Sequence, residues 1–274
     1  IGAAEQVLIL AHWFHEQDEF DVADFLTGET LSRAGFQPPF AEDGGHRDQD
    51  PGGYFFLSGT TYSVYDFFYR RQSVECGGVD VFHTKDLAGG GEIFGQDFVN
   101  VVAERSGPVE RAFEWCCGPS FIGFALLGRG LCRTLSGADV NPKAVAASNY
   151  SARRGGLSER TTLYLSDGLR DIPASEQWDL VIASPPMARE PSPNFPGHPR
   201  LSVDAGWRLH EDFYSVLAAH LKDGGRALVQ ETRSHSRADD FRPMIEAGGL
   251  EVEAVLDNKI HGGIYYLSVA KASG

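Results

Sequence analysis

The chain of 274 residues has few cysteines and no long apolar run. Its four cysteines include no Cys-x-x-Cys pair, so they indicate neither a zinc site nor a disulfide framework; they are Cys76, Cys116, Cys117 and Cys132. No stretch approaches the roughly 20 apolar residues that cross a bilayer, and no secretory signal opens the chain. The start at Ile1 instead of Met indicates a trimmed or processed end. We therefore expect a cytoplasmic globular protein without a membrane partner.

Positive charge is also scarce. The chain has 24 Lys and Arg against 38 Asp and Glu, which gives a net charge of −14. This balance argues against a partner whose phosphate backbone must be gripped, so we predict no nucleic-acid partner. Arg153, Arg154 and Arg160 form a local basic cluster, which is either a basic patch or, as we favour, a solvated helix face. The sequence does not specify an oligomeric state.

Two regions differ in pattern. Residues 1–80 are mixed: 7–14 is typical of a helix, 41–53 is polar and glycine-rich, and 54–69 is dense in aromatic residues. The aromatic block fits either a substrate pocket or the packing face of a small domain, and we favour packing. We predict an N-terminal substrate-recognition or lid region over 1–80 and a second domain over 81–274.

The second region alternates strand and helix patterns, which predicts an α/β fold with a doubly wound, mostly parallel, Rossmann-like sheet of seven strands. The strands are expected at 111–115, 134–139, 161–166, 180–183, 226–231, 250–257 and 264–271. The helices are expected at 121–128, 142–154, 207–221 and 238–247. No helix separates the last two strands, so we expect an antiparallel hairpin at the end of the sheet.

Polar motifs follow several of these strands. The fourth strand stops at Ser184-Pro185-Pro186-Met187, where the prolines forbid further pairing and stiffen the chain. The first strand leads into a turn over 114–123 whose Gly118 lets the backbone approach a ligand. Asp139 ends the second strand, and Ser166-Asp167-Gly168 follows the third. Ligands of doubly wound sheets bind at this edge, beyond the carboxyl ends of the strands.

This arrangement resembles the class I methyltransferases that depend on S-adenosylmethionine (SAM), over about residues 80–271. Ser-Pro-Pro-Met is similar to their Asn/Asp/Ser-Pro-Pro-aromatic motif, which is associated with methylation of amine or amide nitrogens. The resemblance implies SAM as the cofactor, S-adenosylhomocysteine as its product, and no metal. It implies that Asp139 binds the ribose hydroxyls and Asp167 the adenine amino group. Cys116 and Ser120 stand where many members have glycine.

The resemblance implies two sets of site residues. The cofactor set is Glu114, Cys116, Gly118, Phe121, Ile122, Asp139, Val140, Asn141, Ser166, Asp167, Gly168 and Ser184. The transfer set is Ser184, Pro185, Pro186 and Met187. In that set, Ser184 Oγ and the Pro185 carbonyl accept N–H groups and aim the acceptor nitrogen, mainly an orientation effect.

The segment before the sheet stands where related enzymes place a lid, and its glycines, at 89–91 and 95, permit movement. We expect substrate contacts in this segment, although structural hydrogen bonds or solvated charges explain its polar residues equally well. The candidates are His83, Glu92, Phe94, Gln96 and Asp97. His198, His210, His235 and His261 have no metal-ligand spacing, so we expect no metal.

We expect N-methylation of a small molecule, an amino-acid derivative or a peptide. Glutamine methyltransferases of release factors and ribosomal proteins are similar in organisation but use Asn-Pro-Pro-Tyr. DNA cytosine N4 methyltransferases use Ser-Pro-Pro-aromatic, and here the acidic charge and Met187 argue against that substrate. The first alternative is a protein methyltransferase of the glutamine type or a nucleic-acid methyltransferase acting on an exocyclic amine, and the second is an inactive methyltransferase-like scaffold or partner subunit. A nicotinamide dehydrogenase is the alternative for the cofactor, and it lacks an intact Gly-x-Gly-x-x-Gly here.

Overall fold

A computed structural model describes residues 71–84, 87, 91–190 and 203–272. The helix predicted at 7–14, the polar, glycine-rich segment at 41–53 and the aromatic block at 54–69 lie outside these residues. No helix among the described residues is long and apolar enough to cross a membrane.

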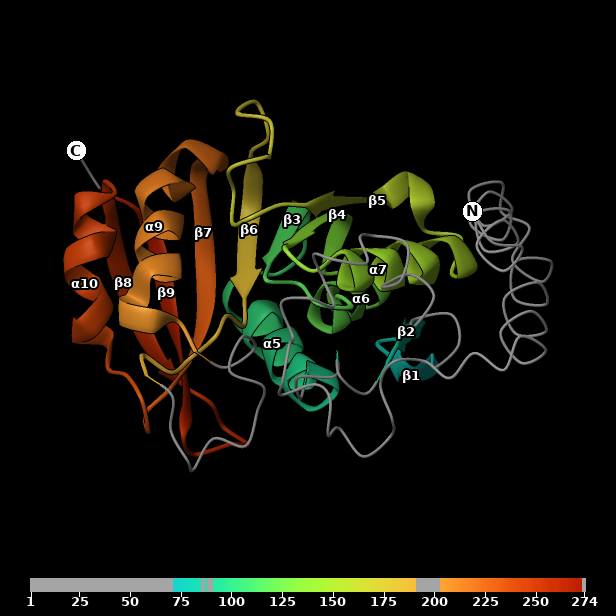
Figure 1. Cartoon of the computed structure of the whole chain (residues 1–274), viewed down its shortest axis with the longest axis horizontal. Helices are drawn as coiled ribbons and strands as arrows, with labels where there is room; N and C mark the ends of the chain where they lie inside the picture. Colours follow the sequence, from blue (N-terminus) through green and yellow to red (C-terminus); the bar gives the residue numbers. More distant parts are fainter. Residues whose placement is uncertain (1–70, 85–86, 88–90, 191–202, 273–274) are drawn as a thin grey trace, which may run out of the picture.

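Seven strands form the central sheet, side by side across the molecule (Figure 1). In chain order they are β3 (Val109–Trp115), β4 (Cys132–Asp139), β5 (Thr161–Leu165), β6 (Trp178–Ala183), β7 (Leu221–Thr232), β8 (Leu250–Asp257) and β9 (Ile264–Lys271). Their order in the sheet is β5-β4-β3-β6-β7-β9-β8, and β3 to β7 pair in parallel. The predicted fold class is confirmed.

The winding direction reverses between β3 and β6. The chain runs outward from β3 through β4 to β5, and then returns to place β6 on the other side of β3. This reversal is the topological switch point, where the connections at the carboxyl ends diverge and leave room for a ligand.

The C-terminal hairpin has the predicted bounds, with β9 antiparallel to both β7 and β8. One detail differs from the expectation. The antiparallel strand β9 is inserted between β7 and β8, so β8 is the edge strand and runs parallel to β7. The alternating burial of β8 fits an edge position, because one of its faces meets solvent.

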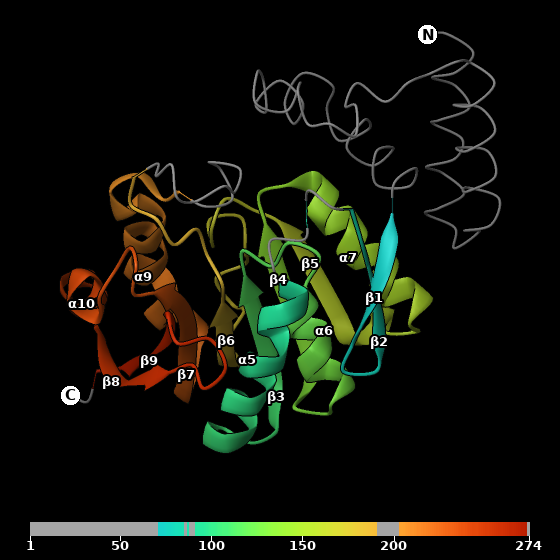
Figure 2. The ribbon, with the colours of Figure 1, turned by 90° about the horizontal axis from the view of Figure 1, so that it is seen from below.

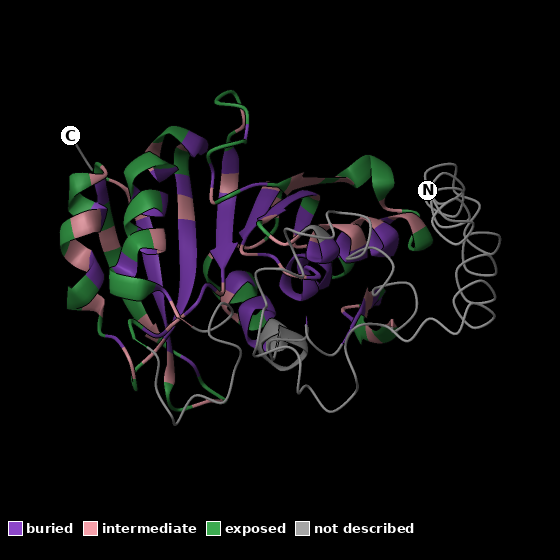
Figure 3. Cartoon of the chain, in the orientation of Figure 1, coloured by how far each residue is buried: buried purple, intermediate pink, exposed green. Residues whose placement is uncertain are grey.

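Helices cover both faces of the sheet. Buried side chains of α9 (Arg208–His220) and α10 (Ala238–Ala247) pack on one face. Buried side chains of α5 (Gly91–Arg105), α6 (Phe121–Gly128) and α7 (Pro142–Arg154) pack on the other. Short 3-10 turns lie at Ser158–Arg160 and Ala205–Trp207. Figure 3 shows the central strands buried and the outer faces of α9 and α10 exposed.

Two sequence expectations need correction here. The helix expected at 207–221 begins only at Arg208, because Trp207 has a left-handed φ of 64°, and Leu221 already starts β7. From Gly91 onward, the segment expected to form a glycine-rich lid is the helix α5.

A small hairpin precedes α5 and consists of β1 (Gln72–Cys76) and β2 (Val79–His83). It lies beside α7, as Figure 2 shows, and its residues Cys76, Val79 and Val81 share an apolar cluster with α6. The domain boundary expected at residue 80 therefore falls inside this hairpin.

Candidate functional site

The carboxyl ends of β3, β4, β5 and β6 meet at one edge of the sheet, because these strands are parallel. This edge collects the turn at Gly118, Asp139, Ser166 and Ser184 from segments far apart in the sequence. Burial is the main cause that raises the pKa of the Cys116 thiol well above its usual value, and the charges of Asp139, Asp204 and Asp167 add to the shift. The polar residues that the sequence places after these strands therefore lie at one edge of the sheet, and their role as one site stays a prediction.

The turn after β3 contains left-handed backbone where glycine is expected and absent. Cys116 has φ 53°, Gly118 has φ 52° and Ser120 has φ 63°. A residue with a Cβ pays about 1–2 kcal/mol for this conformation. Backbone strain of this kind in a packed turn is typical of ligand-binding sites. Cys116 and Ser120 thus adopt a backbone conformation that glycine usually supplies.

This strain predicts opposite responses at two adjacent cysteines. At position 116 we expect the Gly variant to be more stable than the Ala variant by about 1 kcal/mol, because glycine tolerates positive φ. At Cys117, whose φ is not positive, Ala should be more stable than Gly by about 0.5–1 kcal/mol. Urea unfolding of Cys116→Gly, Cys116→Ala, Cys117→Gly and Cys117→Ala measures both differences. The same sign at both positions would contradict the strain.

Glu114 braces this turn from below. Its carboxyl group is only 3% exposed, accepts the Gly123 N–H at 3.0 Å, and forms a hydrogen bond with the Ser120 hydroxyl. Burial is the main cause that raises the pKa of Glu114 to about 8. The predicted cofactor residue Glu114 therefore shapes the turn through Ser120 and the first turn of α6. Phe121 and Ile122, from the same set, are buried core residues of α6.

Asp139 joins this turn to the next strand. Its Oδ2 accepts the Gly118 N–H and its Oδ1 accepts the Asn141 N–H, each at 2.8 Å. Burial raises the pKa of Asp139, and these two hydrogen bonds oppose the shift. A carboxylate has about four acceptor positions, so the backbone does not occupy all of them and a hydroxyl group of a ligand can be accepted as well.

The two residues after Asp139 have different roles: Val140 gives this edge an exposed apolar side chain, and Asn141 caps the start of α7. Val140 is 63% exposed, which leaves an apolar side chain open next to the carboxylate. Asn141 caps α7 by accepting the Lys143 N–H at 3.0 Å. A planar apolar group of a ligand can cover Val140 while its polar part meets Asp139.

The third group of polar residues, 166–168, follows β5. The Ser166 hydroxyl is buried and donates to the Gly168 carbonyl at 3.0 Å, so it closes the local turn. Asp167 is exposed and forms an ion pair with Arg170 at 3.3 Å. Asp167 is therefore the residue of this group whose carboxylate is accessible to a ligand.

The tip beyond β6 is held by its prolines and by a returning segment. Pro185 and Pro186 are buried, whereas Ser184 and Met187 are partly exposed. Ala188 pairs with Val203 in a parallel bridge, and its carbonyl accepts the Asp204 N–H at 2.8 Å. Strand β6 therefore fixes the chain before Ser184-Pro185-Pro186-Met187, and the contacts of Ala188 fix it afterwards.

The expected substrate contacts are dispersed. His83 is buried on β2, with its ring edge-on to Phe121 at 5.0 Å between ring centres. Asp97 is buried on α5, and its Oδ2 has no hydrogen-bond partner among the described residues. Helix α5 includes Glu92, Phe94 and Gln96, but the structure describes only the backbone of these three residues.

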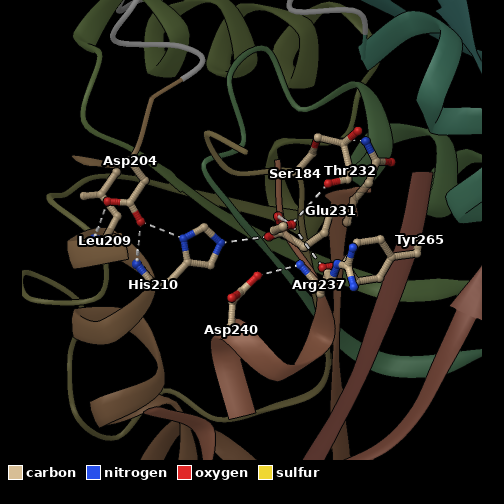
Figure 4. A network of polar contacts seen from close by, with 11 residues as sticks. Ser184, Asp204, Leu209, His210, Glu231, Thr232, Arg237, Asp240 and Tyr265 are labelled. Carbon is tan, nitrogen blue, oxygen red and sulfur yellow. Dashed lines mark hydrogen bonds and ion pairs between the residues drawn. The ribbon is translucent and has the colours of Figure 1, made fainter. Parts of the chain in front are cut away.

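A buried network at the same edge escaped the sequence analysis. The His210 ring lies between two carboxylates, with Nδ1 2.7 Å from Asp204 Oδ2 and Nε2 2.8 Å from Glu231 Oε1 (Figure 4). All three side chains are at most 1% exposed. On the far side of Glu231, its Oε2 accepts the Ser236 hydroxyl, which lies 3.0 Å from Tyr265 Oη.

The charges of this network follow from its geometry. Burial alone would lower the pKa of His210, but the Glu231 charge and the hydrogen bonds to both carboxylates raise it to about 9. Burial acts to raise the pKa of Asp204, and the hydrogen bonds from His210 and Leu209 reverse the effect and lower it. His210 is therefore an imidazolium at neutral pH that ties the start of α9 to the end of β7.

The sequence carried little signal for this network. Asp204, His210 and Glu231 come from separate segments and match no short motif. The described residues hold no group of three or more His, Cys, Asp and Glu side chains that suits a metal ion.

No protein-family model matches the chain. A ribosomal protein L11 methyltransferase of Yersinia pseudotuberculosis serotype O:1b (strain IP 31758) is 40% identical over 71 residues, which cover 26% of this chain and 23% of that protein. The L11 methyltransferase of Pectobacterium carotovorum subsp. carotovorum (strain PC1) gives the same values. The similarity thus spans less than a quarter of the length of these relatives.

Solved structures share the architecture. The glycopeptide N-methyltransferase MtfA has a TM-score of 0.50 at 14% identity, over 65% of this chain and 90% of that chain. The ribosomal protein L11 methylase of Lactobacillus delbrueckii subsp. bulgaricus has a TM-score of 0.48 at 13% identity, over 64% of this chain and 78% of that chain. The Rossmann-like architecture of this chain is therefore similar to that of the solved MtfA structure.

Proposed function

We propose that the chain is a SAM-dependent methyltransferase that modifies a nitrogen atom of a protein or peptide. The observation that carries this proposal is the strained turn at 116–120, which Asp139 holds by a hydrogen bond and which follows the strand paired with the one that ends before Ser184. The local similarity to ribosomal protein methyltransferases supports the same activity.

The edge fits SAM in shape and chemistry. The open acceptor positions of Asp139 would hold the ribose hydroxyls, and exposed Val140 would cover one face of the adenine. Asp167 would meet the adenine amino group, and the turn at Gly118 would lie along the methionine part. When bound, SAM supplies an electrophilic methyl group on a sulfonium.

The tip would aim the acceptor. Ser184 Oγ and the Pro185 carbonyl would accept N–H groups of the acceptor and orient its lone pair for in-line attack. Pro185 and Pro186 fix these acceptors in space, so the expected contribution is orientation rather than proton transfer. Met187 is a flexible side chain that would cover an aliphatic part of the acceptor.

A protein acceptor has more support than a small molecule. The curated relatives are named for a ribosomal protein, and one structural neighbour is named for a glycopeptide. Neither comparison favours the free small molecule that the sequence analysis expected. The expectation against nucleic acid rests on the net charge of −14 and on Met187 in place of an aromatic residue, and it stays a prediction.

Labelled SAM tests both parts of the proposal. The full chain is incubated with methyl-labelled SAM and four separate acceptor pools: total ribosomal protein, short peptides, free amino acids, and total tRNA. Label in ribosomal protein or peptides supports the proposal. Label confined to tRNA or to free amino acids would refute the acceptor class. SAM binding without transfer to any pool would favour the inactive scaffold, and absence of SAM binding would refute the cofactor.

Asp139→Ala should weaken SAM binding about tenfold to a hundredfold, because hydrogen bonds to a charged group contribute about 1.5–3 kcal/mol. Isothermal titration with SAM and with S-adenosylhomocysteine measures the loss. Asp167→Ala, in the exposed third group of polar residues, is the matched control and should lose less. Unchanged affinity in Asp139→Ala would show that the ribose lies elsewhere.

A further inference from the structure

Gln230 is a buried polar residue at the end of β7 that the proposed cofactor and transfer sets do not include. Its side chain is 0% exposed, and its Nε2 donates to Ser184 Oγ at 3.3 Å. Its Oε1 is also buried and has no hydrogen-bond partner among the described residues. One end of the amide thus touches the tip, and the other end is unsatisfied.

A purely structural role does not explain this arrangement. Interior amides normally bond at both ends, and an unpaired buried oxygen destabilises the fold. Exchanging the oxygen and nitrogen of the amide would only move the unpaired group, because Ser184 is the partner at one end alone. An apolar side chain of similar volume would remove the unpaired oxygen altogether. The amide is therefore expected to serve the site at the expense of stability.

The sheet register places Gln230 level with the tip. Ala183 of β6 pairs with Val229 of β7, so the next residues on the two strands are Ser184 and Gln230. Gln230 shares a face with Leu228, which belongs to the apolar cluster of α5 and α6. On its other side Gln230 pairs with Tyr266 of β9, so strand β7 is still part of the sheet at this level. The amide is thus anchored on a rigid strand, whereas Ser184 lies just beyond the end of one.

We propose that Gln230 is a positioning residue of the transfer site, which holds the Ser184 oxygen so that its remaining lone pair faces the N–H of the methyl acceptor. This inference rests on the proposed function. The donated hydrogen bond from Nε2 occupies one lone pair of Ser184 Oγ and fixes the direction of the other. Misplacement of an orienting group by about 1 Å can lower a rate about a hundredfold, so this restraint has a measurable effect.

The test is Gln230→Met, which keeps the length of the side chain but removes the amide. Turnover of labelled SAM with total ribosomal protein should fall about tenfold to a hundredfold, while the SAM dissociation constant from isothermal titration changes less than twofold. The thermal midpoint should rise by about 2–4 °C, because the unpaired oxygen is gone. Gln177→Met is the matched control, since Gln177 is an exposed glutamine bonded only to the Ala219 carbonyl; it should leave turnover and SAM affinity unchanged.

A double-mutant cycle identifies the route of the effect. If Gln230 acts through Ser184, Ser184→Ala should lower turnover, and adding Gln230→Met should lower it no further. Equal, additive losses would overturn the inference. So would a Gln230→Met variant with a lower thermal midpoint, or an active wild type whose turnover is unaffected by that variant. A wild type that binds SAM but labels no pool would refute the proposed function instead. The thermal midpoint of Gln230→Met would still show whether the buried amide destabilises the fold.

Discussion

Replacement of His210 by Phe is expected to lower the free energy of unfolding by about 3–5 kcal/mol at pH 7. The imidazolium lies between Asp204 and Glu231, and none of the three side chains is more than 1% exposed. Removing the cation leaves two buried carboxylates without their counter-charge, which is strongly destabilising. Phe fills a comparable volume, so the loss reports the charge and not a cavity. Urea unfolding followed by circular dichroism measures it.

His220 provides the matched control on the same helix. It is buried and stacks on Trp178, but its Nδ1 lies 2.8 Å from the Glu176 carbonyl, and no carboxylate of the described residues is bonded to its ring. His220→Phe should therefore lower the free energy of unfolding clearly less than His210→Phe. Adding Glu231→Gln to His210→Phe should recover part of the loss, because one buried charge disappears. Equal losses in the two His variants would refute the charge argument.

The dependence on pH has a definite sign. The folded pKa of His210, about 9, lies above its ordinary value of 6.5. The bound proton therefore stabilises the fold fully below pH 6.5, and this stabilisation is lost as the pH rises through 9. The difference between the wild type and His210→Phe should shrink by about 3 kcal/mol across that interval.

This network shows what the sequence could not provide. Local patterns predicted α7 and the β8–β9 hairpin to the residue, because an Asn141 cap, a Gly155 stop and short alternating runs act over a few positions. The contacts of His210 with Glu231 join residues 21 positions apart and depend on how β7 and α9 pack. No short motif encodes such a pairing.

Errors at element ends have local physical causes. Strand β7 starts at Leu221, earlier than expected, because Trp178 pairs with Leu221 and a register shift separates that pair from the rest. Gly224, with φ 76°, lies in this irregular part, and its sequence pattern favours a turn. At the candidate site, the polar residues were predictable from strand ends. The left-handed φ of Cys116 and Ser120 was not, because only the packed turn imposes it.

The largest pH effect is expected at Glu114, under the cofactor turn. Its folded pKa of about 8 lies above the ordinary value of 4.5, so the folded state favours the neutral carboxyl group. Burial is the main cause, and the nearby charge of Asp139 adds to it. Stability from this proton is complete below pH 4.5 and is lost as the pH rises through 8. The total loss is about 4–5 kcal/mol for a group that is 3% exposed.

Glu114→Gln isolates this effect, because the amide keeps the size of the side chain and its acceptor oxygen but does not titrate. Relative to this variant, the wild type should lose about 1.4 kcal/mol of unfolding free energy per pH unit between pH 4.5 and 8. Glu110→Gln, at an exposed position of the same strand, controls for the removal of a carboxyl group. Parallel pH curves for the wild type and Glu114→Gln would show that Glu114 is ionised in the fold.

Because Glu114 holds Ser120 and the Gly123 N–H, SAM affinity should weaken over the same pH range in the wild type, and less in Glu114→Gln. The brace under the turn thus couples the protonation of one buried carboxyl group to the shape of the proposed cofactor site.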